Sequence, residues 1–321
     1  MKLLSTLRRR KRLLLLLLLC FTLGPSVWCR LTAPWNEISL HALSSSPTPR
    51  APENSSQLSL VCFNIAHGRG QALSNLDGGS AAEREARLRS IGAQLCELDA
   101  DVVVLNEVDF QASWSNGVNQ AEFLAKEAGY GYWLEQRNFD ARFLGWTWRF
   151  GNALLSKVPI ESYETINLVG DSWWESVLAG KKKGINCTLA LGGRSVRVLG
   201  VHLSYRSEAV RVRSARQLLA ITESSQELVF VAGDLNSSPF EFSYAAVDDA
   251  GNNALTILGE SEPLQRRVYP SKSEAFTYEA RGKRRMLDWI LVPANCRFSS
   301  YEIIESQLSD HRPVYARVEL P

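Results

Sequence analysis

Polar residues that could handle a metal ion or a phosphate close six strand-like apolar runs in this chain. In order, the runs read VCFN (61–64), VVLNE (103–107), GNALLS (151–156), LGVHL (199–203), VAGDLN (231–236) and LSDHRP (308–313). One polar residue at the end of a strand is ordinary, because strands end at the surface. Six such ends together supply amides, carboxylates and imidazoles, a set rich in oxygen that suits a hard divalent cation and a phosphoryl group.

The elements that would position these residues are buried strands and amphipathic helices. The run 58–65 is apolar on both alternations, which predicts a strand buried on both faces. Within 81–98, apolar residues recur at helical spacing among Glu and Arg, which predicts a surface helix. Further strands are expected over 101–108, 151–156, 184–191, 196–203, 228–232, 287–292 and 314–320.

Two more helices follow from periodicity and end signals. One is expected over 120–128, stopped by Gly129, and one over 208–223, with Ser207 as its cap. Alternating strands and helices indicate α/β layers, whereas strands without helices between 152 and 202 indicate hairpins in a partly antiparallel sheet. These patterns alone leave the topology open.

The order and spacing of the six segments resemble the endonuclease/exonuclease/phosphatase superfamily of DNase I-like nucleases, abasic-site endonucleases, secreted sphingomyelinases and inositol-polyphosphate phosphatases. The resemblance runs from Leu58 to Leu320 and includes the strand MLDWIL (286–291) as the penultimate motif. It implies an α/β fold of two packed mixed β-sheets with helices on their outer faces, a four-layer α-β-β-α sandwich. The site would lie at one edge, where the strand ends converge.

The resemblance also implies a role for each residue. Metal ligation or positioning falls to Asn64, Glu107 and Asp310, and phosphate binding to Asn152. The catalytic groups would be His202, Asp234, Asn236, Asp288 and His311. Asp234 would orient or deprotonate the attacking water or protonate the leaving group, and Asp288 would orient His311.

Each of these residues also has an ordinary structural interpretation. Asn64 alone is typical of a turn, Glu107 of a paired strand-end carboxylate, and an isolated His202 of a structural histidine. His41 and His67 are expected to be structural, although His67 follows Asn64 in a Gly-rich loop and an outer substrate contact stays open for it.

Composition indicates one globular domain without the charge of a strong polyanion binder. The chain has 321 residues, 45% hydrophobic and 22% charged, with a formal net charge of +2. Much of the positive excess lies in the basic run 8–12, outside the expected domain. Electrostatic attraction to nucleic acid is therefore not expected to dominate.

The amino-terminal segment predicts export. A basic run precedes the apolar stretch 13–19, so residues 1–30 are expected to be a cleaved signal peptide or, as the alternative, an uncleaved signal anchor. A lipoprotein signal through Cys29 fits less well. Residues 31–57, rich in Ser and Pro, are expected to be a linker before the domain 58–321.

Export would permit disulfides among the remaining cysteines. These are Cys62, Cys96, Cys187 and Cys296. Because none has the close spacing of a metal or redox motif, isolated core thiols are the favoured interpretation.

The sequence thus predicts an exported, monomeric, Mg²⁺-dependent phosphoesterase that hydrolyses a phosphodiester by in-line attack of water, with Mn²⁺ able to substitute. The substrate would be nucleic acid, or a phospholipid or small molecule. Five tryptophans and the lysines 181–183 flank the central segment, and Trp173 with Trp174 could meet bases or a membrane interface. The alternative is a catalytically inactive member that binds phosphoesters, although no motif is broken.

Overall fold

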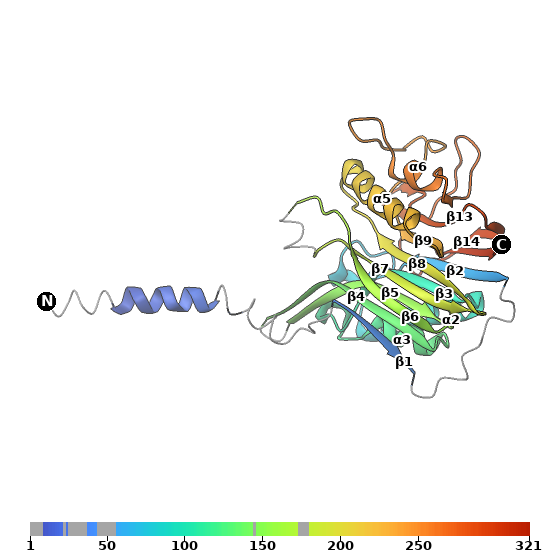
Figure 1. Cartoon of the computed structure of the whole chain (residues 1–321). Helices are drawn as coiled ribbons and strands as arrows, with labels where there is room; N and C mark the ends of the chain where they lie inside the picture. The colour runs from blue at the N-terminus through green and yellow to red at the C-terminus, as the bar shows by residue number, and fades with distance from the viewer. Residues whose placement is uncertain (1–8, 22–23, 25–36, 44–55, 144–145, 173–179) are drawn as a thin grey trace.

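Two β-sheets form the centre of the molecule (Figure 1). The computed structural model describes residues 9–21, 24, 37–43, 56–143, 146–172 and 180–321. The first sheet has seven strands, which in spatial order are β1 (Ile38–Ala42), β4 (Tyr132–Phe143), β5 (Trp146–Ser156), β3 (Val102–Asp109), β2 (Gln57–Asn64), β15 (Val314–Glu319) and β14 (Arg297–Ile303).

The second sheet has six strands and packs against the first. In spatial order these are β10 (Leu264–Gln265), β13 (Asp288–Pro293), β9 (Leu228–Asp234), β8 (Arg194–His202), β7 (Lys183–Leu191) and β6 (Ile160–Asn167). A small hairpin pairs β11 (Tyr278–Ala280) with β12 (Lys283–Arg285). The pairs β2–β3 and β8–β9 are parallel and their neighbours are antiparallel, so both sheets are mixed, as predicted.

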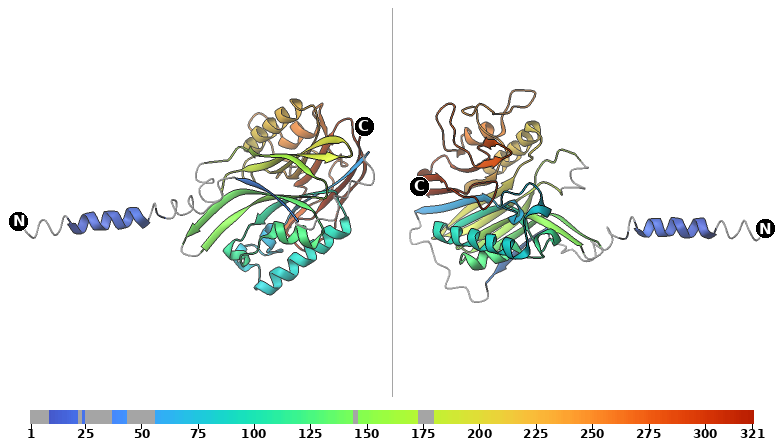
Figure 2. Two further views of the ribbon diagram at one scale, coloured as in Figure 1. Left: turned by 60° about the horizontal axis from the view of Figure 1, so that its bottom comes forward. Right: turned by 180° about the vertical axis from the view of Figure 1, so that it is seen from behind.

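Helices cover the outer face of each sheet. The first sheet carries α2 (Ala81–Leu98) and α3 (Gln120–Glu127), and the second carries α5 (Glu208–Glu223) and α6 (Ala254–Gly259). Figure 2 shows α2 and α3 on the side of the molecule opposite α5. The four-layer α-β-β-α sandwich is therefore confirmed.

The helices begin and end close to the predicted residues, and α2 and α5 are capped in different ways. Ser80 and Glu83 form a capping box at the start of α2, with Ser80 N donating to Glu83 Oε2 at 2.8 Å. Helix α5 spans the predicted 208–223. Ser207 occupies its N-cap position, as predicted, although its hydroxyl accepts no capping hydrogen bond.

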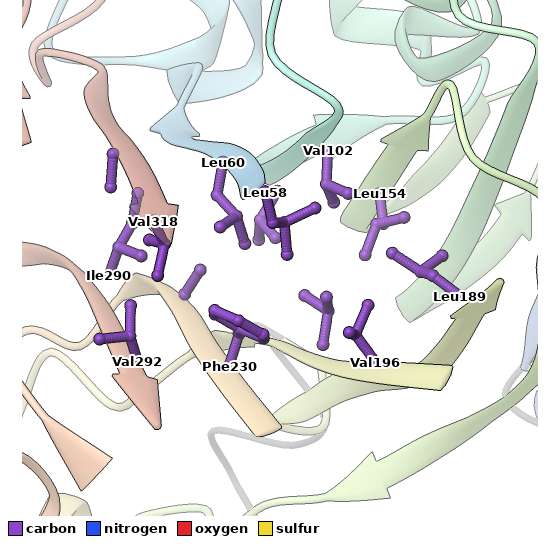
Figure 3. Close-up of a cluster of buried hydrophobic side chains, with 14 of the residues drawn as sticks. Leu58, Leu60, Val102, Leu154, Leu189, Val196, Phe230, Ile290, Val292 and Val318 are labelled. Atoms are coloured by element: carbon purple, nitrogen blue, oxygen red, sulfur yellow. The ribbon is translucent and has the colours of Figure 1, made fainter. Parts of the chain in front are cut away.

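The double-sided apolar pattern of 58–65 has a direct structural cause. Leu58, Leu60 and Cys62 on β2 face the second sheet and join the core between the sheets, where Phe230 from β9 also lies (Figure 3). Val61 and Phe63 point the other way, toward α2 and α3. Burial on both faces was correctly predicted, because a sheet in the middle of four layers exposes neither side.

The amino-terminal region was only partly predicted. Within the expected linker 31–57, Ile38–Ala42 forms β1 and pairs antiparallel with β4, whereas 44–55 lies outside the described residues. Residues 9–21 are helical, and the leucines at 13–19 are exposed. Across the parts of the chain that the structure describes, no helix combines the length and apolarity needed to cross a membrane.

The cysteines of the domain are separate thiols. Cys62, Cys187 and Cys296 are free and buried, and Cys96 is free and exposed on α2. Core packing, the favoured interpretation, therefore holds for three of the four.

Replacing Phe230 by Ala should lower the free energy of unfolding by about 3–5 kcal/mol, because it opens a cavity between the sheets. The matched control is Phe240→Ala, at a side chain that is 59% exposed, which should change stability by less than about 0.5 kcal/mol. Urea denaturation followed by circular dichroism measures both. Equal losses would contradict the placement of Phe230 in the core.

Candidate active site

Three predicted residues lie side by side at one edge of the second sheet. The register of the strands pairs Asp234 with His202 on β8 and with Asp288 on β13. Gly233 makes this possible, since it has φ +135° and a Cβ there would lie 2.0 Å from the Val201 carbonyl oxygen. Residues far apart in sequence thus become neighbours because the parallel strands β8 and β9 end, and the antiparallel strand β13 begins, at the same edge.

Asn64 and Asn106 join the first sheet to this row. Asn64 is the last residue of β2 and pairs with Asn106 within β3, and both are fully buried. Asn106 Oδ1 accepts from Asp234 N at 2.9 Å, and its Nδ2 donates to the Val201 carbonyl at 3.1 Å. Asn106, which we did not predict as a site residue, therefore ties the two sheets together at the site.

The Asn64 amide connects two carboxylates. Its Nδ2 donates to Glu107 Oε1 at 3.2 Å and to Asp234 Oδ2 at 3.1 Å, and its Oδ1 accepts from Ala66 N at 3.0 Å. A neutral donor between two acids reduces their repulsion without adding charge. Asn64 consequently fixes the distance between the expected metal ligand and the expected base.

Backbone strain turns several side chains into the cleft. Glu107 sits at an irregularity of the β3–β5 pairing and has φ +52°, and His67 and Asn236 also have positive φ, +54° and +50°. Such conformations are costly for residues with a Cβ and are found where function fixes them. The unusual backbone conformation directs the Glu107 side chain into the cleft, whereas the other side chains of β3 are buried.

His311 and Asp288 form the predicted dyad. His311 Nδ1 contacts Asp288 Oδ2 at 2.7 Å, and both residues are buried. Although burial opposes it, the Asp288 carboxylate raises the pKa of His311 to about 10. His311 Nε2 lies 3.9 Å from Asp234 Oδ2, so at neutral pH a protonated imidazole faces the expected base.

Asp234 is the centre of the arrangement. Its Oδ1 accepts from Asn236 N at 2.9 Å, which closes an Asx turn, and its Oδ2 lies 3.6 Å from His202 Nε2. Burial, together with the Asp288 carboxylate, raises the pKa of Asp234 above its usual range. Burial and the charge of Lys182 lower the pKa of His202 to about 3, so His202 is neutral near pH 7.

A second dyad, which sequence reasoning missed, contains His67. Its Nδ1 contacts Asp109 Oδ1 at 2.7 Å, and its Nε2 lies 3.5 Å from Glu107 Oε2. Asp109 is fully buried and also accepts from Trp114 Nε1 at 2.7 Å. The available signal was the closeness of His67 to Asn64 in sequence. His41, by contrast, stacks on Trp133 and contacts none of the site residues, as expected.

Arg69 is a further site residue that we did not predict. Its guanidinium donates to Glu107 Oε2 at 3.2 Å and to Asp310 Oδ2 at 3.0 Å. Although burial favours the neutral acid, the nearby charges of His67 and Arg69 hold the pKa of Glu107 well below its usual range. Glu107 is therefore ionised.

The expected role of Asn152 is contradicted. Its side chain is fully buried and does not line the cleft. Its Nδ2 donates to Gln136 Oε1 and to the Lys183 carbonyl, and its Oδ1 accepts from Asn106. With its polar groups occupied by protein partners, Asn152 supports Asn106 from below instead of binding phosphate.

The other predicted side chains surround one cleft of about 460 Å³. Its lining includes Glu107, His202, Asp234, Asn236, Asp310 and His311, together with His67, Arg69, Asn138, Phe150, Lys182, Tyr205 and Tyr278. Asn64 and Asp288 lie behind this lining, where Asn64 contacts Asp234 and Asp288 contacts His311. The geometry thus gathers the site predicted from six separated motifs.

The flanking aromatic and basic residues separate into different environments. Trp133 is buried in the core, whereas Trp146 is 45% exposed and stacks near Trp148. Trp173 and Trp174 lie outside the described residues. Lys183 is buried and pairs with Glu37 at 2.6 Å, and Lys182 lines the cleft, so the lysine run is not simply a solvated tip.

The donors on the cleft suit a hard divalent cation. Glu107 and Asp310 offer carboxylate oxygens, and no cysteine is part of the lining. A second acidic group, Asp234, Asp288 and His311, has its ligand atoms within 4.8 Å of one another. Since Asp288 lies behind the cleft lining whereas Glu107 and Asp310 both face the cleft, Glu107 and Asp310 fit better.

This fold and this site define a class of phosphoryl-transfer hydrolases. The sequence model of the Endonuclease/Exonuclease/phosphatase family matches residues 61–311, and the chain belongs to this family of metal-dependent phosphoesterases. The superfamily predicted from the sequence is therefore confirmed. No match was found among curated proteins.

Solved structures agree on the fold. A family protein from Bacteroides vulgatus is 19% identical, with a TM-score of 0.59 over 83% of this chain and 99% of the other. The human Nocturnin catalytic domain, bound to sulfate, is 18% identical, with a TM-score of 0.58 over 88% and 97%. A mannosyl-6-phosphatase from Bacteroides thetaiotaomicron is 13% identical, with a TM-score of 0.55 over 81% and 99%.

Turnover should follow a bell-shaped pH profile. Activity rises as Asp234 loses its proton, above the usual carboxylate range, and falls as His311 loses its proton near pH 10. Asp288→Asn removes the charge that raises both pKa values, so both limbs of kcat/KM should move to lower pH. The control Glu227→Gln, at a salt bridge with Arg197, should move neither. Limbs that stay in place in Asp288→Asn would exclude this coupling.

Proposed function

We propose that this protein hydrolyses a phosphodiester by in-line attack of water, with Mg²⁺ as its natural cation and Mn²⁺ as a substitute. The observation that carries the proposal is a continuous series of contacts along the cleft, which runs Asp288, His311, Asp234, Asn64, Glu107. It places an acid and base pair next to an ionised, hard oxygen ligand, the combination that phosphoryl transfer needs.

Glu107 and Asp310 would hold the cation, and Asn64 would keep Glu107 in place. When bound, the cation neutralises charge that develops on the phosphoryl oxygens. Oxygen ligands without thiolate favour Mg²⁺ or Mn²⁺ over zinc.

Different side chains would remove the proton from water and stabilise the charge on the phosphoryl group. Asp234 orients and deprotonates the attacking water, because its raised pKa brings it close to the pH of reaction. His311 and His202 both lie near Asp234, and each donates a hydrogen bond to a phosphoryl oxygen. His311 does so as a protonated imidazole and His202 as a neutral one. The Asn236 amide lines the same cleft and adds a further donor.

The cleft supports a phospholipid or small phosphodiester as well as a nucleic acid. Its rim combines Lys182 with Tyr205, a ring that is 59% exposed and that Arg206 also covers, at 5.2 Å. A base, a sugar or a polar headgroup could pack there, and the net charge of +2 gives no broad basic footprint for a duplex. We propose that the protein acts as a monomer on such a substrate.

The competing proposal is an inactive member that only binds phosphoesters. It would require a broken motif, yet Glu107, Asp234, Asp288 and His311 are present and in mutual contact range through Asn64. Catalysis is therefore the better supported function.

Purified protein should turn over at least one substrate among plasmid DNA, sphingomyelin, phosphoinositides and bis-p-nitrophenyl phosphate. Chelation should abolish turnover and Mg²⁺ or Mn²⁺ should restore it. Asp234→Asn and His311→Ala should each lower kcat by at least about a hundredfold while the circular dichroism spectrum is unchanged. Full activity after exhaustive EDTA treatment would refute metal dependence. Plasmid nicking without lipid turnover would establish a nuclease.

We also propose that the catalytic domain is exported. The basic run before the leucines at 13–19 supports insertion with the positive end inside, and residues 1–30 would act as a cleaved signal peptide or an uncleaved anchor. Protease added to spheroplasts should then digest the domain. Protection until the membrane is lysed would reverse the topology, and a cytoplasmic marker protein in the same sample controls for leakage.

A further inference from the structure

The carboxylates expected to hold the divalent cation already share a positive group, Arg69. One guanidinium nitrogen, Nη1, is 3.2 Å from Glu107 Oε2, and the other, Nη2, is 3.0 Å from Asp310 Oδ2. The Arg69 side chain is only 14% exposed, so solvent screens these ion pairs weakly. Arg69 therefore balances the formal charge of Glu107 and Asp310 in part before any ion arrives.

The loop around Arg69 holds the guanidinium in place. Its Nε donates to the Ala72 carbonyl at 2.8 Å, and its Nη1 reaches Asn75 Oδ1 at 3.3 Å. Arg87 supports the same loop by donating to the carbonyls of Gly68 and Gly78. Because its donors are directed by fixed partners, the guanidinium is a preorganised part of the site.

We propose that Arg69 is a resident cation of the metal site, which competes with the divalent ion for Glu107 and Asp310 and makes firm metal binding depend on a phosphate group. The formal charges give the reason. The charge of the nearby His67 is offset by its own partner, Asp109. A divalent ion and Arg69 together then bring three positive charges to Glu107 and Asp310, and one singly charged phosphodiester restores the balance. Metal and substrate then stabilise each other's binding, a coupling that is reciprocal.

This inference rests on the proposed function, because it takes Glu107 and Asp310 as the metal site. The experiment measures Mn²⁺ binding to metal-free protein by electron paramagnetic resonance, with and without inorganic phosphate. Arg69→Gln should bind Mn²⁺ at least about tenfold more tightly than wild type without phosphate, since it removes a nearby positive charge. Phosphate should tighten binding about fivefold or more in wild type and less in Arg69→Gln.

Two further variants make the result specific. Arg87→Gln weakens the same loop without touching a carboxylate, so its Mn²⁺ affinity should stay within about twofold of wild type. Arg69→Lys keeps the charge but loses the forked geometry, and its affinity should fall between wild type and Arg69→Gln.

Equal or weaker Mn²⁺ binding by Arg69→Gln would overturn the inference, because Arg69 would then only orient the ligands. If Arg69→Gln does not fold, a wild-type Mn²⁺ affinity that is unchanged by phosphate would overturn the inference equally. The proposed function fails in a different way: Mn²⁺ binding by wild type that is absent, or unchanged in Glu107→Gln, would show that these carboxylates are not the metal site.

Discussion

The Asn64 amide, shared between Glu107 and Asp234, is the interaction on which the site depends. It joins the end of a strand in the first sheet to the end of a strand in the second. In the proposed mechanism the two carboxylates have different roles, Glu107 as a charged oxygen ligand and Asp234 as a base. They must therefore lie close together while their pKa values stay apart, lowered for Glu107 and raised for Asp234. A neutral donor fixed by Ala66 N satisfies this condition.

The series of contacts continues beyond both carboxylates and ends on each side in a His–Asp pair. Beyond Asp234 come His311 and Asp288, and beyond Glu107 come His67 and Asp109. Each end is an imidazole held at 2.7 Å by a buried carboxylate. The buried acids therefore have partners, which the low dielectric of a fold interior demands.

The sandwich supplies the rigidity that this arrangement needs. The core between the sheets fixes β2 and β9 relative to one another, and Asn106 on β3 adds direct hydrogen bonds to Asp234 on β9 and to Val201 on β8. The strained backbone conformations of Glu107 and Asn236 can persist because the surrounding strands hold the chain in place on both sides. Lys182 and Tyr205 line the same cleft, and in the proposed function they are the side chains that would contact the part of the substrate beyond the phosphate.

By itself the sequence indicated α/β layers, the ends of the main helices and a set of polar strand ends, because apolar periodicity and burial on both faces of 58–65 are local patterns. The four-layer arrangement and the role of each candidate site residue followed only from the resemblance to the family. The sequence did not determine Arg69 and His67, whose partners lie elsewhere in the chain, nor the burial of Asn152 beneath Asn106. Ile38–Ala42 was also missed, since a short edge strand has little periodicity and acquires its structure from pairing with β4. Tertiary structure decided these points, because a side chain's role depends on which partners the two sheets bring to it.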